Sequence, residues 1–408
     1  MQIFSDNTPP CIVLGLETQI GLSVVRELGK AGVKVIGMTH DPQAIGLGSK
    51  YLFRSVIVSP PRSENWIAAI VALGKKFGPC CLMAVSEVNL KWLAENRKKF
   101  GQVIPLVPSL DTLALVLDKQ RTLSLARDVG ILIPETAEPK SMEEVETVAA
   151  NFKFPAILKW KDPNSISPKL SAAGIELHKI QYVYTAIEFL EAARSYEPVG
   201  EWPLVQSYCP GVGLGQFFYM HKGQAVRRFQ HMRIAEWPPE GGFSSVCDSV
   251  PLDQHVALQE QSIALLQQAG WEGVAMVEYR WDKKTNRSVL MEINGRYWGS
   301  YPLAAQCGAN FSVIAYALNS GIEPPPLNPV TVQRRCRMVS TEIKRLFRIC
   351  FQPTLIADRT FEIHPLAEIK RFFRDYFKRN VGYYIWDLND PKPFYLDGRN
   401  LLRKLFKS

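Results

Sequence analysis

The stretch "GVAMVEYRWDKKTNRSVLMEINGRYWGS" (residues 273–300) is the most informative part of this sequence. Two runs of alternating apolar and polar residues flank a polar turn around Thr285, which predicts a β-hairpin. With Thr285 at the centre of the turn, Glu278 lies opposite Glu292, and their Cβ atoms are about 5 Å apart. Like charges at this distance destabilise a pair of strands unless a group of opposite charge lies between them.

The alternation gives the hairpin one largely apolar face and one polar face that includes Glu278. On the partner strand, the polar face is expected to hold three side chains: Leu290, Glu292 and Asn294. Carboxylate and carboxamide oxygens are ligands that Mg²⁺ accepts, usually together with substrate phosphates. The alternative is a solvated strand face on which Arg280 or Lys283 neutralises the acids. The residue pattern alone leaves both readings open.

Residues 11–41 have the pattern strand, helix, strand, which favours a doubly wound α/β sheet. Gly15 and Gly21 are separated by five residues, whereas dinucleotide-binding turns have the spacing G-x-G-x-x-G. We therefore favour a packing turn over NAD or FAD binding. A further strand is expected to end near Glu87, and this first domain to end near residues 105–113.

The next segments alternate between predicted helices and strands. One helix is expected to precede Gly130, and further helices are expected near residues 254–269 and 301–319. The short apolar strand "FPAILKWKD" (residues 154–162) contains Lys159. An ammonium group among apolar neighbours needs an anionic partner, either a bound phosphate or a nearby acid.

The segments "VEY" (277–279) and "VLMEINGRYWGS" (289–300) resemble the metal-binding hairpin of the ATP-grasp superfamily. That superfamily includes biotin carboxylase, D-alanine–D-alanine ligase and carbamoyl phosphate synthetase. The resemblance implies that Arg296 faces a carboxylate or an acyl phosphate. It also implies that Mg²⁺ (or Mn²⁺) ions, bridging the phosphates of ATP, are held by three residues: Glu278, Glu292 and Asn294.

Other nucleotide-binding landmarks of the superfamily follow in the expected order. Lys119, after Asp118, resembles the first phosphate-contacting lysine, and Lys159 resembles the second, on the lid strand. "PLVQSYCPG" (residues 203–211) resembles the hinge that binds adenine mainly through backbone groups. The resemblance places this contact at four residues: Gln206, Ser207, Tyr208 and Cys209.

"FQHMRIAEWPPEGG" resembles the strand that carries substrate contacts in the biotin carboxylase branch. The resemblance implies that His231 lies near the ribose or phosphates and Arg233 near the carboxylate substrate; a solvated basic strand is the alternative. Glu87 is a candidate ligand contact, since open α/β sheets bind ligands at the ends of their strands. An ordinary helix cap is the favoured reading for Glu87.

The sequence departs from the superfamily pattern at two places. Gly213 stands where many relatives have a ribose-binding glutamate, and the lid loop at residues 161–174 lacks a glycine-rich run. The missing glycines argue against a biotin-dependent carboxylase. The pattern is most similar to the bacterial carboxylate–amine ligases.

The resemblance implies an α/β ATP-grasp fold in four parts. We expect a Rossmann-like domain preceding the ATP-grasp unit, then a linker helix with a lid subdomain, a central subdomain and a mainly helical C-terminal extension. Their predicted ranges are 1–110, 111–205, 206–322 and 323–408. The expected activity is ATP-dependent joining of a small-molecule carboxylate to an amine. The alternatives are a carboxylase, a small-molecule kinase and a non-catalytic ATP-binding regulatory protein.

The charge of the chain is concentrated near its C-terminus. Residues 331–408 hold 17 Lys and Arg against 8 Asp and Glu, so this segment accounts for the whole net charge of +9. Such a distribution argues against a nucleic-acid-binding protein. The basic segment is expected to cover the core with its apolar side; contact with an anionic membrane surface or an acidic partner is the alternative.

Composition and termini favour a cytoplasmic protein. The first ten residues show no basic-then-apolar pattern, and no apolar run reaches the roughly 20 residues of a membrane span. The eight cysteines lack C-x-x-C spacing, which favours reduced thiols. The sequence leaves the oligomeric state open, with a homo-oligomer among the alternatives.

Overall fold

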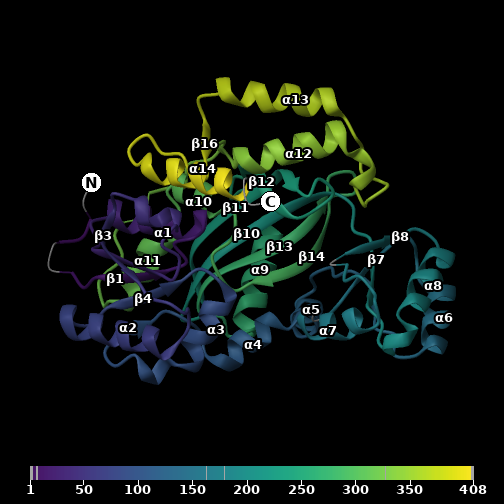
Figure 1. Cartoon of the computed structure of the whole chain (residues 1–408), viewed down its shortest axis with the longest axis horizontal. Helices are drawn as coiled ribbons and strands as arrows, with labels where there is room; N and C mark the ends of the chain where they lie inside the picture. The colour runs from purple at the N-terminus through teal and green to yellow at the C-terminus, as the bar shows by residue number, and fades with distance from the viewer. Residues whose placement is uncertain (1–2, 6–7, 162, 179, 327, 406–408) are drawn as a thin grey trace.

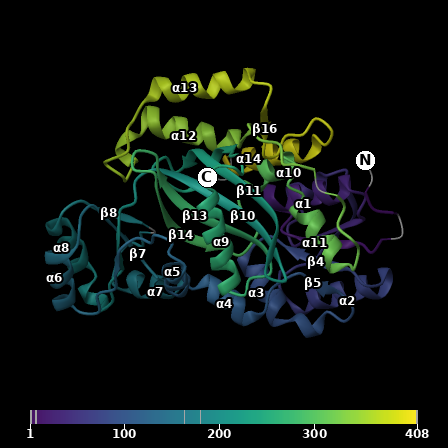
Figure 2. The ribbon, with the colours of Figure 1, turned by 180° about the vertical axis from the view of Figure 1, so that it is seen from behind.

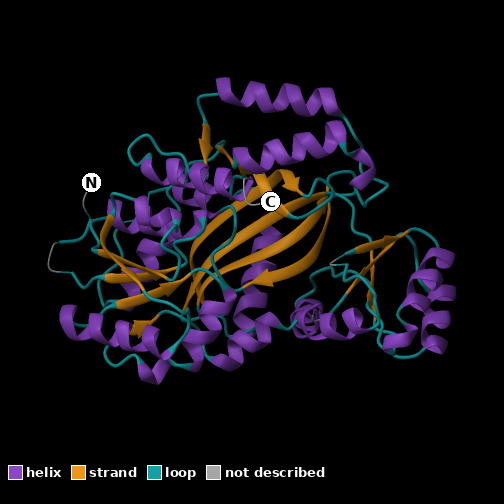
Figure 3. Ribbon diagram, viewed as in Figure 1, coloured by secondary structure: helices purple, strands orange, loops and turns teal. Residues whose placement is uncertain are grey.

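The protein is described by a computed structural model (Figure 1). The residues that it describes are 3–5, 8–161, 163–178, 180–326 and 328–405. Sheets of five, four and seven strands organise this part of the chain, with helices packed around them (Figure 3).

The N-terminal sheet is parallel throughout, in the order β3-β2-β1-β4-β5. Its strands are β1 (Cys11–Leu14), β2 (Val35–Thr39), β3 (Leu52–Ile57), β4 (Cys81–Ala84) and β5 (Ile104–Pro105). The helices are α1 (Gln19–Lys30), α2 (Glu64–Phe77) and α3 (Glu87–Glu95). A Cβ atom on Gly21 would lie 2.2 Å from the carbonyl oxygen of Gly15. Close packing therefore accounts for both glycines of the first turn.

Two helices, instead of the single expected one, lead out of this domain: α4 (Leu110–Leu117) and α5 (Lys119–Asp128). Asp118 separates them because its extended backbone ends α4 and its side chain caps α5. The carboxylate accepts hydrogen bonds from the amides of Gln120 and Arg121. Lys119 is thereby fixed at the first position of α5.

The four-stranded unit, residues 136–207, has its own apolar core. Its sheet has the order β6-β9-β7-β8 and its strands are antiparallel. The strands are β6 (Thr136–Ala137), β7 (Ala156–Lys159), β8 (Gln181–Val183) and β9 (Leu204–Ser207). The helices are α6 (Met142–Asn151), α7 (Pro163–Ala172) and α8 (Ala186–Ser195). The predicted boundary between residues 205 and 206 falls inside β9.

The seven-stranded central sheet has the order β14-β13-β10-β11-β12-β15-β16. Its first five strands are β10 (Val212–His221), β11 (Gln224–Trp237), β12 (Phe243–Ser249), β13 (Gly273–Asp282) and β14 (Arg287–Asn294). Helix α9 (Val256–Gln268) agrees with the sequence prediction. The single helix expected at 301–319 is instead α10 (Tyr301–Gln306) and α11 (Phe311–Asn319). The break contains Gly308 and Asn310, which both have a positive φ angle incompatible with a continuous helix.

The predicted hairpin is confirmed, with Glu278 paired to Glu292. Tyr279, however, pairs with Leu290, so β14 has a bulge at Met291. The bulge turns Leu290 into the apolar core beside Tyr279 and Ile293. The prediction that Leu290 shares the polar face was therefore wrong, because a strict alternation has no place for the extra residue.

The C-terminal extension is part of the sheet as well as helical. Strand β15 (Arg335–Arg337) pairs with β12, and β16 (Val381–Tyr383) pairs with β15. The helices are α12 (Val339–Phe351), α13 (Pro365–Arg374) and α14 (Lys392–Leu405). Figures 1 and 2 show α12 beside the central sheet, α13 outside α12, and α14 beside the N-terminal domain.

One apolar cluster joins the N-terminal domain, the central sheet and the extension. It includes Val13 of β1, Phe217 of β10, Trp298 and Tyr384. The three parts therefore share a packed interior rather than meeting at a polar seam. All eight cysteines lie in the described ranges and none forms a disulfide.

Candidate functional site

The polar face of the hairpin continues across β10 and β11. In this part of the sheet Gly215 is flanked by Glu278 on β13 and His231 on β11, and Gly213 is flanked by Arg280 on β13. Two glycines on one strand therefore lie between polar and charged side chains of the neighbouring strands.

The glycines leave room for side chains that cross the strand. A Cβ atom on Gly213 would lie 2.6 Å from Cδ of Arg233, and one on Gly215 would lie 2.8 Å from Nε2 of His231. The missing glutamate at position 213 thus has a steric reason, since any side chain there would displace Arg233. A glycine inside a strand is a known sign of such an approach.

Arg233 is held by two carboxylates. Its guanidinium donates to Glu278 at 2.6 Å and to Glu236 at 2.9 Å. Glu236 also accepts from Arg280 at 3.2 Å, so the ion pair of Arg280 is with Glu236, and its charge reaches Glu278 only from nearby. Sequence reasoning missed Glu236, because it lies at the end of β11, where only the fold brings it to the hairpin.

The two hairpin glutamates differ in their proton affinity. Burial raises the pKa of Glu278 to about 7; the charges of Glu292 and Glu236 add to this effect and Arg233 opposes it. Burial also disfavours the charged form of Glu292, but Lys119 and Asn294 outweigh it and lower the pKa of that carboxyl. One acid is therefore firmly ionised and the other is poised near neutrality.

A chain of contacts extends from Glu292 toward the N-terminal domain. Lys119 lies 3.3 Å from Oε2 of Glu292, and the amide of Asn294 donates to Oε1 at 2.9 Å. Arg296 donates to Asn294 at 2.9 Å and to Glu87 at 2.8 Å. These contacts bring together residues predicted separately from three segments of the sequence.

Glu87 belongs to the first turn of α3, rather than to the end of a strand as expected. Ser86 caps this helix by accepting from the amide of Asn89. The side chain of Glu87 is therefore not needed as the cap and is free to bind Arg296. A salt bridge across the domain boundary thus orients the arginine.

Lys159 and Lys119 line a cavity of about 400 Å³ between α4, α5 and the four-stranded unit. Lys159 donates to the side-chain oxygen of Gln206. Burial lowers the pKa of Lys159 to about 8, with Lys119 adding to the effect. No acid forms a salt bridge with Lys159 in the described part of the chain, so the nearby-acid alternative is not what the structure contains.

The segment after β9 is tied to neighbouring strands by its backbone. The amide of Ser207 donates to the carbonyl of Glu135 at 2.9 Å, and the amide of Tyr208 to that of Pro155 at 3.1 Å. Cys209 is buried. This segment therefore has a fixed course from the four-stranded unit into the central sheet.

His231 lies inside the central sheet. Its Nδ1 is 3.0 Å from the hydroxyl of Ser300, and its ring packs edge-on against Phe217. Burial, with Arg233 nearby, lowers its pKa well below the usual range, so the ring is neutral. Nε2 has no hydrogen-bond partner among the described residues. The structure does not bring His231 to the cavity that holds the lysines.

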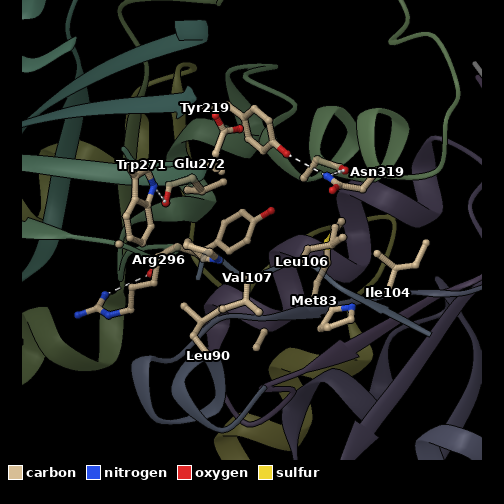
Figure 4. Close-up of a pocket in the computed structure, with 18 of the residues that line it drawn as sticks. Met83, Leu90, Ile104, Leu106, Val107, Tyr219, Trp271, Glu272, Arg296 and Asn319 are labelled. Carbon is tan, nitrogen blue, oxygen red and sulfur yellow. Dashed lines mark hydrogen bonds between the residues drawn. The ribbon is translucent and has the colours of Figure 1, made fainter. Parts of the chain in front are cut away.

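A second pocket, of about 170 Å³, separates the N-terminal domain from the central sheet. Figure 4 shows Arg296 at one end of it and Tyr219, hydrogen-bonded to Asn319, at the other. Its walls are largely apolar and include Leu90 and Leu106. The hydroxyl of Tyr297, which also lines this pocket, is buried and has no partner within the described ranges.

A loop of the C-terminal extension contacts the four-stranded unit. Asp358, between α12 and α13, is 4% exposed and accepts from the hydroxyls of Tyr184 at 3.0 Å and Tyr208 at 2.9 Å. Arg359 donates to Glu188 at 2.9 Å. These two tyrosines are at least 150 residues away from Asp358 along the chain, and no sequence pattern indicates the contacts.

Replacing Asp358 by alanine is expected to loosen the four-stranded unit. Two hydrogen bonds to a buried carboxylate are lost, each worth about 1.5–3 kcal/mol. Amide hydrogen exchange in residues 181–195 should accelerate at least about tenfold, as measured by mass spectrometry. The exposed Asp253 is the matched control, and its replacement should leave exchange unchanged. Unaltered exchange in the Asp358→Ala protein would show that the loop does not restrain this unit.

Among the described residues, no three His, Cys, Asp or Glu side chains form a group that could hold a metal ion. The hairpin set differs in composition, since its third oxygen donor is the carboxamide of Asn294. Glu278 and Glu292 provide the two carboxylates. A Mg²⁺ ion held by such a set is completed by ligands from outside the protein, such as phosphate oxygens.

No model of a protein family and no curated protein matches this sequence. Solved structures do match. Biotin carboxylase from Campylobacter jejuni, in a β-γ-ATP complex, has a TM-score of 0.60 and 16% identity, over 81% of this chain and 75% of its own. N5-carboxyaminoimidazole synthetase from Staphylococcus aureus, complexed with ADP, has a TM-score of 0.59 and 12% identity, over 82% of each chain.

L-amino acid ligase from Bacillus licheniformis has a TM-score of 0.54 and 16% identity, over 78% of each chain. Identities this low show the fold alone. All three neighbours are ATP-grasp proteins, so the fold class expected from the hairpin is confirmed.

Proposed function

We propose that this ATP-grasp protein is a carbon–nitrogen ligase. It would activate a carboxylate as an acyl phosphate at the expense of ATP and join it to an amine, releasing ADP and phosphate. The supporting observation is that Glu278, Glu292 and Lys119 meet on one face of the central sheet, with Lys159 across the adjoining cavity. Phosphoryl transfer needs positioning and charge stabilisation above all.

The nucleotide would bind between the four-stranded unit and the central sheet, with Lys119 and Lys159 on its phosphates. The adenine would lie against the segment from Gln206 to Cys209. The amides of Ser207 and Tyr208 are already engaged, so the base would be bound by the remaining backbone groups of that segment. His231 would need a rearrangement to reach the ribose or phosphates, because its ring is buried.

Mg²⁺ or Mn²⁺ would be held by Glu278, Glu292 and Asn294. These side chains fit such an ion: all offer hard oxygens, and Oε1 of Glu278 accepts no hydrogen bond from the described residues. A cation would also favour the ionised form of Glu278, whose pKa burial raises to about 7. When bound, the ion would offset the charge of the nucleotide phosphates.

Two arginines would act on the carboxylate substrate. Arg296 is oriented by Glu87 and Asn294, and it lies where the hairpin meets the N-terminal domain. Its guanidinium would stabilise the carboxylate and then the acyl phosphate. Arg233 is bound to Glu278 on the same face of the sheet, so its charge would act from beside the hairpin acids. Closure of the four-stranded unit would exclude water, since acyl phosphates hydrolyse readily.

The pocket of about 170 Å³ beside Arg296 would receive part of the acid or the amine. Its apolar walls suit a compact apolar group, and the unpartnered hydroxyl of Tyr297 would supply one hydrogen bond to it. Acids with small aliphatic or aromatic side chains are therefore the first candidates.

ATP binding is expected to weaken as the pH rises above about 8. Burial lowers the pKa of Lys159 to about 8, so above this pH the nucleotide-free protein must take up a proton to present an ammonium group. The dissociation constant should rise about tenfold per pH unit between 8 and the pKa of an ordinary lysine. Titration calorimetry with a non-hydrolysable ATP analogue at pH 7 to 9.5 measures this.

Lys159→Arg is the matched control, because a guanidinium stays charged throughout this range. Its dissociation constant should change little with pH. A wild-type profile as flat as that of the arginine variant would contradict the role of Lys159. The free energy of unfolding should rise with pH over the same range. Between pH 8 and the pKa of an ordinary lysine, Lys159 is protonated in the unfolded chain but mostly neutral in the fold, so a rising pH makes the fold more stable.

The proposal is tested by assaying ADP and phosphate release with panels of carboxylic acids and amines. Turnover that needs both an acid and an amine supports a ligase. ADP release with phosphate retained on a non-carboxylate substrate would indicate a kinase, and dependence on bicarbonate a carboxylase. ATP binding without any turnover would indicate a regulatory protein. Each of the last three outcomes contradicts the proposal.

A further inference from the structure

The outermost helices of the C-terminal extension leave apolar side chains uncovered. Figures 1 and 2 show α13 at the edge of the molecule, with α12 between it and the central sheet. The packed side of α13 is marked by the buried Phe372, and that of α12 by Arg345 and Ile349. The opposite sides of both helices face solvent.

On α13 the exposed apolar side chains recur at helical spacing and continue into the turn after it. Their positions fall on one side of the helix, at spacings of three and four residues. They are Leu366, Ile369, Phe373 and Phe377. Leu366 is 82% exposed and Phe377 is 86% exposed, so neither side chain is part of the apolar core. We call this set the α13 stripe.

Helix α12 has a stripe of its own, made of Ile343, Phe347 and Phe351. These residues are four positions apart, so they lie above one another on the side opposite Arg345 and Ile349. Phe351 is 74% exposed. Contiguous apolar surface of this kind on a soluble chain marks an interaction site.

The outward-facing charges of α12, α13 and the turn after α13 have a single sign. The acids of these helices, Glu342, Glu368 and Asp375, all turn inward and form ion pairs with arginines of the extension. The outward-facing charges are Lys344, Lys370, Arg374 and Arg379. None of these four forms an ion pair with a residue that the structure describes. The surface is therefore apolar with a basic border.

We propose that α13, together with the stripe of α12, docks the protein on an anionic lipid bilayer. A helix with an apolar face and a basic border lies in the plane of the headgroups, with its aromatic and leucine side chains below them. Each nearby Lys or Arg adds attraction to anionic lipid. In the described part of the chain no helix is long and apolar enough to cross a bilayer.

The charge pattern favours lipid over a second copy of the chain. A twofold contact would place each stripe against the same surface of its partner. Lys370 and Arg374 would then face like charges, with no outward acid on either helix to compensate. An anionic surface, in contrast, complements every outward charge of the two helices.

The test is co-sedimentation of the full chain with vesicles of phosphatidylcholine alone and of phosphatidylcholine with phosphatidylserine. The expected result is binding to the anionic vesicles that weakens as NaCl is raised, and little binding to the neutral ones. Replacing Phe373 and Phe377 together by aspartate should lower the partition coefficient at least about tenfold. Lys370→Glu combined with Arg374→Glu should abolish the preference for phosphatidylserine.

Ile187→Asp is the matched control. Ile187 is 70% exposed on α8, in the four-stranded unit, so its replacement should leave vesicle binding unchanged. Phe377→Asp alone is the variant least able to disturb folding, and thermal unfolding checks each protein. Equal binding to both vesicle types overturns the proposal, as does binding that the aspartate variants retain. A dimer in light scattering that the aspartate variants abolish, without vesicle binding, would identify a second copy as the occupant instead.

Discussion

Replacing Glu292 by alanine is expected to lower ATP turnover about a hundredfold to a thousandfold. Glu292 is the firmly ionised acid of the hairpin, and it contacts both Lys119 and Asn294. Its loss would remove one proposed metal ligand and would leave Lys119 and Asn294 without this contact. ADP release at saturating ATP and Mg²⁺, with the acid and amine found by the panel assay, measures the effect.

Glu292→Gln separates the charge from the shape, because it keeps an acceptor for Asn294 but cannot neutralise a cation. It should be nearly as inactive as the alanine variant and unfold at the wild-type temperature. Glu260→Ala removes a carboxylate whose ion pair with Arg228 lies on the surface, and it should leave turnover unchanged. A folded Glu292→Ala protein that releases ADP as fast as wild type would refute the metal assignment.

Replacing Glu342 by alanine is expected to lower the free energy of unfolding by about 3–5 kcal/mol. Glu342 and Arg337 are both 0% exposed, and Arg371 donates to the other carboxylate oxygen at 3.0 Å. Removing the acid leaves a buried guanidinium without compensation. Urea unfolding followed by fluorescence measures the change.

Glu64→Ala is a suitable control, because Glu64 also lies in the first turn of a helix but pairs with Lys99 in the open. Exposed pairs contribute about 0–1 kcal/mol, so this variant should be close to wild type. If both variants lost the same small amount, the C-terminal extension would not be integral to the fold.

The hairpin shows how far the sequence could predict this site. Alternation and a polar turn gave the pairing of Glu278 with Glu292, because register in a half-buried hairpin is fixed by its apolar face. The bulge at Met291 could not be predicted in this way, because it interrupts the alternation. The observed turn pairs Asp282 with Arg287, one position away from the register expected for a turn centred on Thr285. The extra residue of the bulge restores that register, so the glutamates stay opposed while Leu290 changes face.

Contacts between distant segments were beyond single-sequence reasoning. Arg233 reaches Glu278 only because Gly213 leaves its path clear, and this depends on which strand lies between β11 and β13. The contacts of Asp358 with Tyr184 and Tyr208 likewise follow from the position of the extension. Periodicity identifies elements but carries no information on such pairs.

The basic extension illustrates the same division. Its charge and helical spacing were visible in the sequence, and they left structural cover and surface attachment as alternatives. The structure shows that several arginines are bound to inward-facing acids, among them Arg335 and Arg337. It also shows an apolar side on α13 that the core does not use. One side of these helices thus covers the core, and the opposite side forms an exposed apolar surface.

The most direct test of the proposed ligase is to intercept the activated carboxylate with hydroxylamine. The protein is incubated with ATP, Mg²⁺, hydroxylamine and a panel of amino acids, hydroxy acids and dicarboxylates, and hydroxamates are measured with ADP. The account predicts a hydroxamate from at least one acid, formed in proportion to ADP and absent with Glu292→Gln. ADP release without hydroxamate from any acid would contradict it.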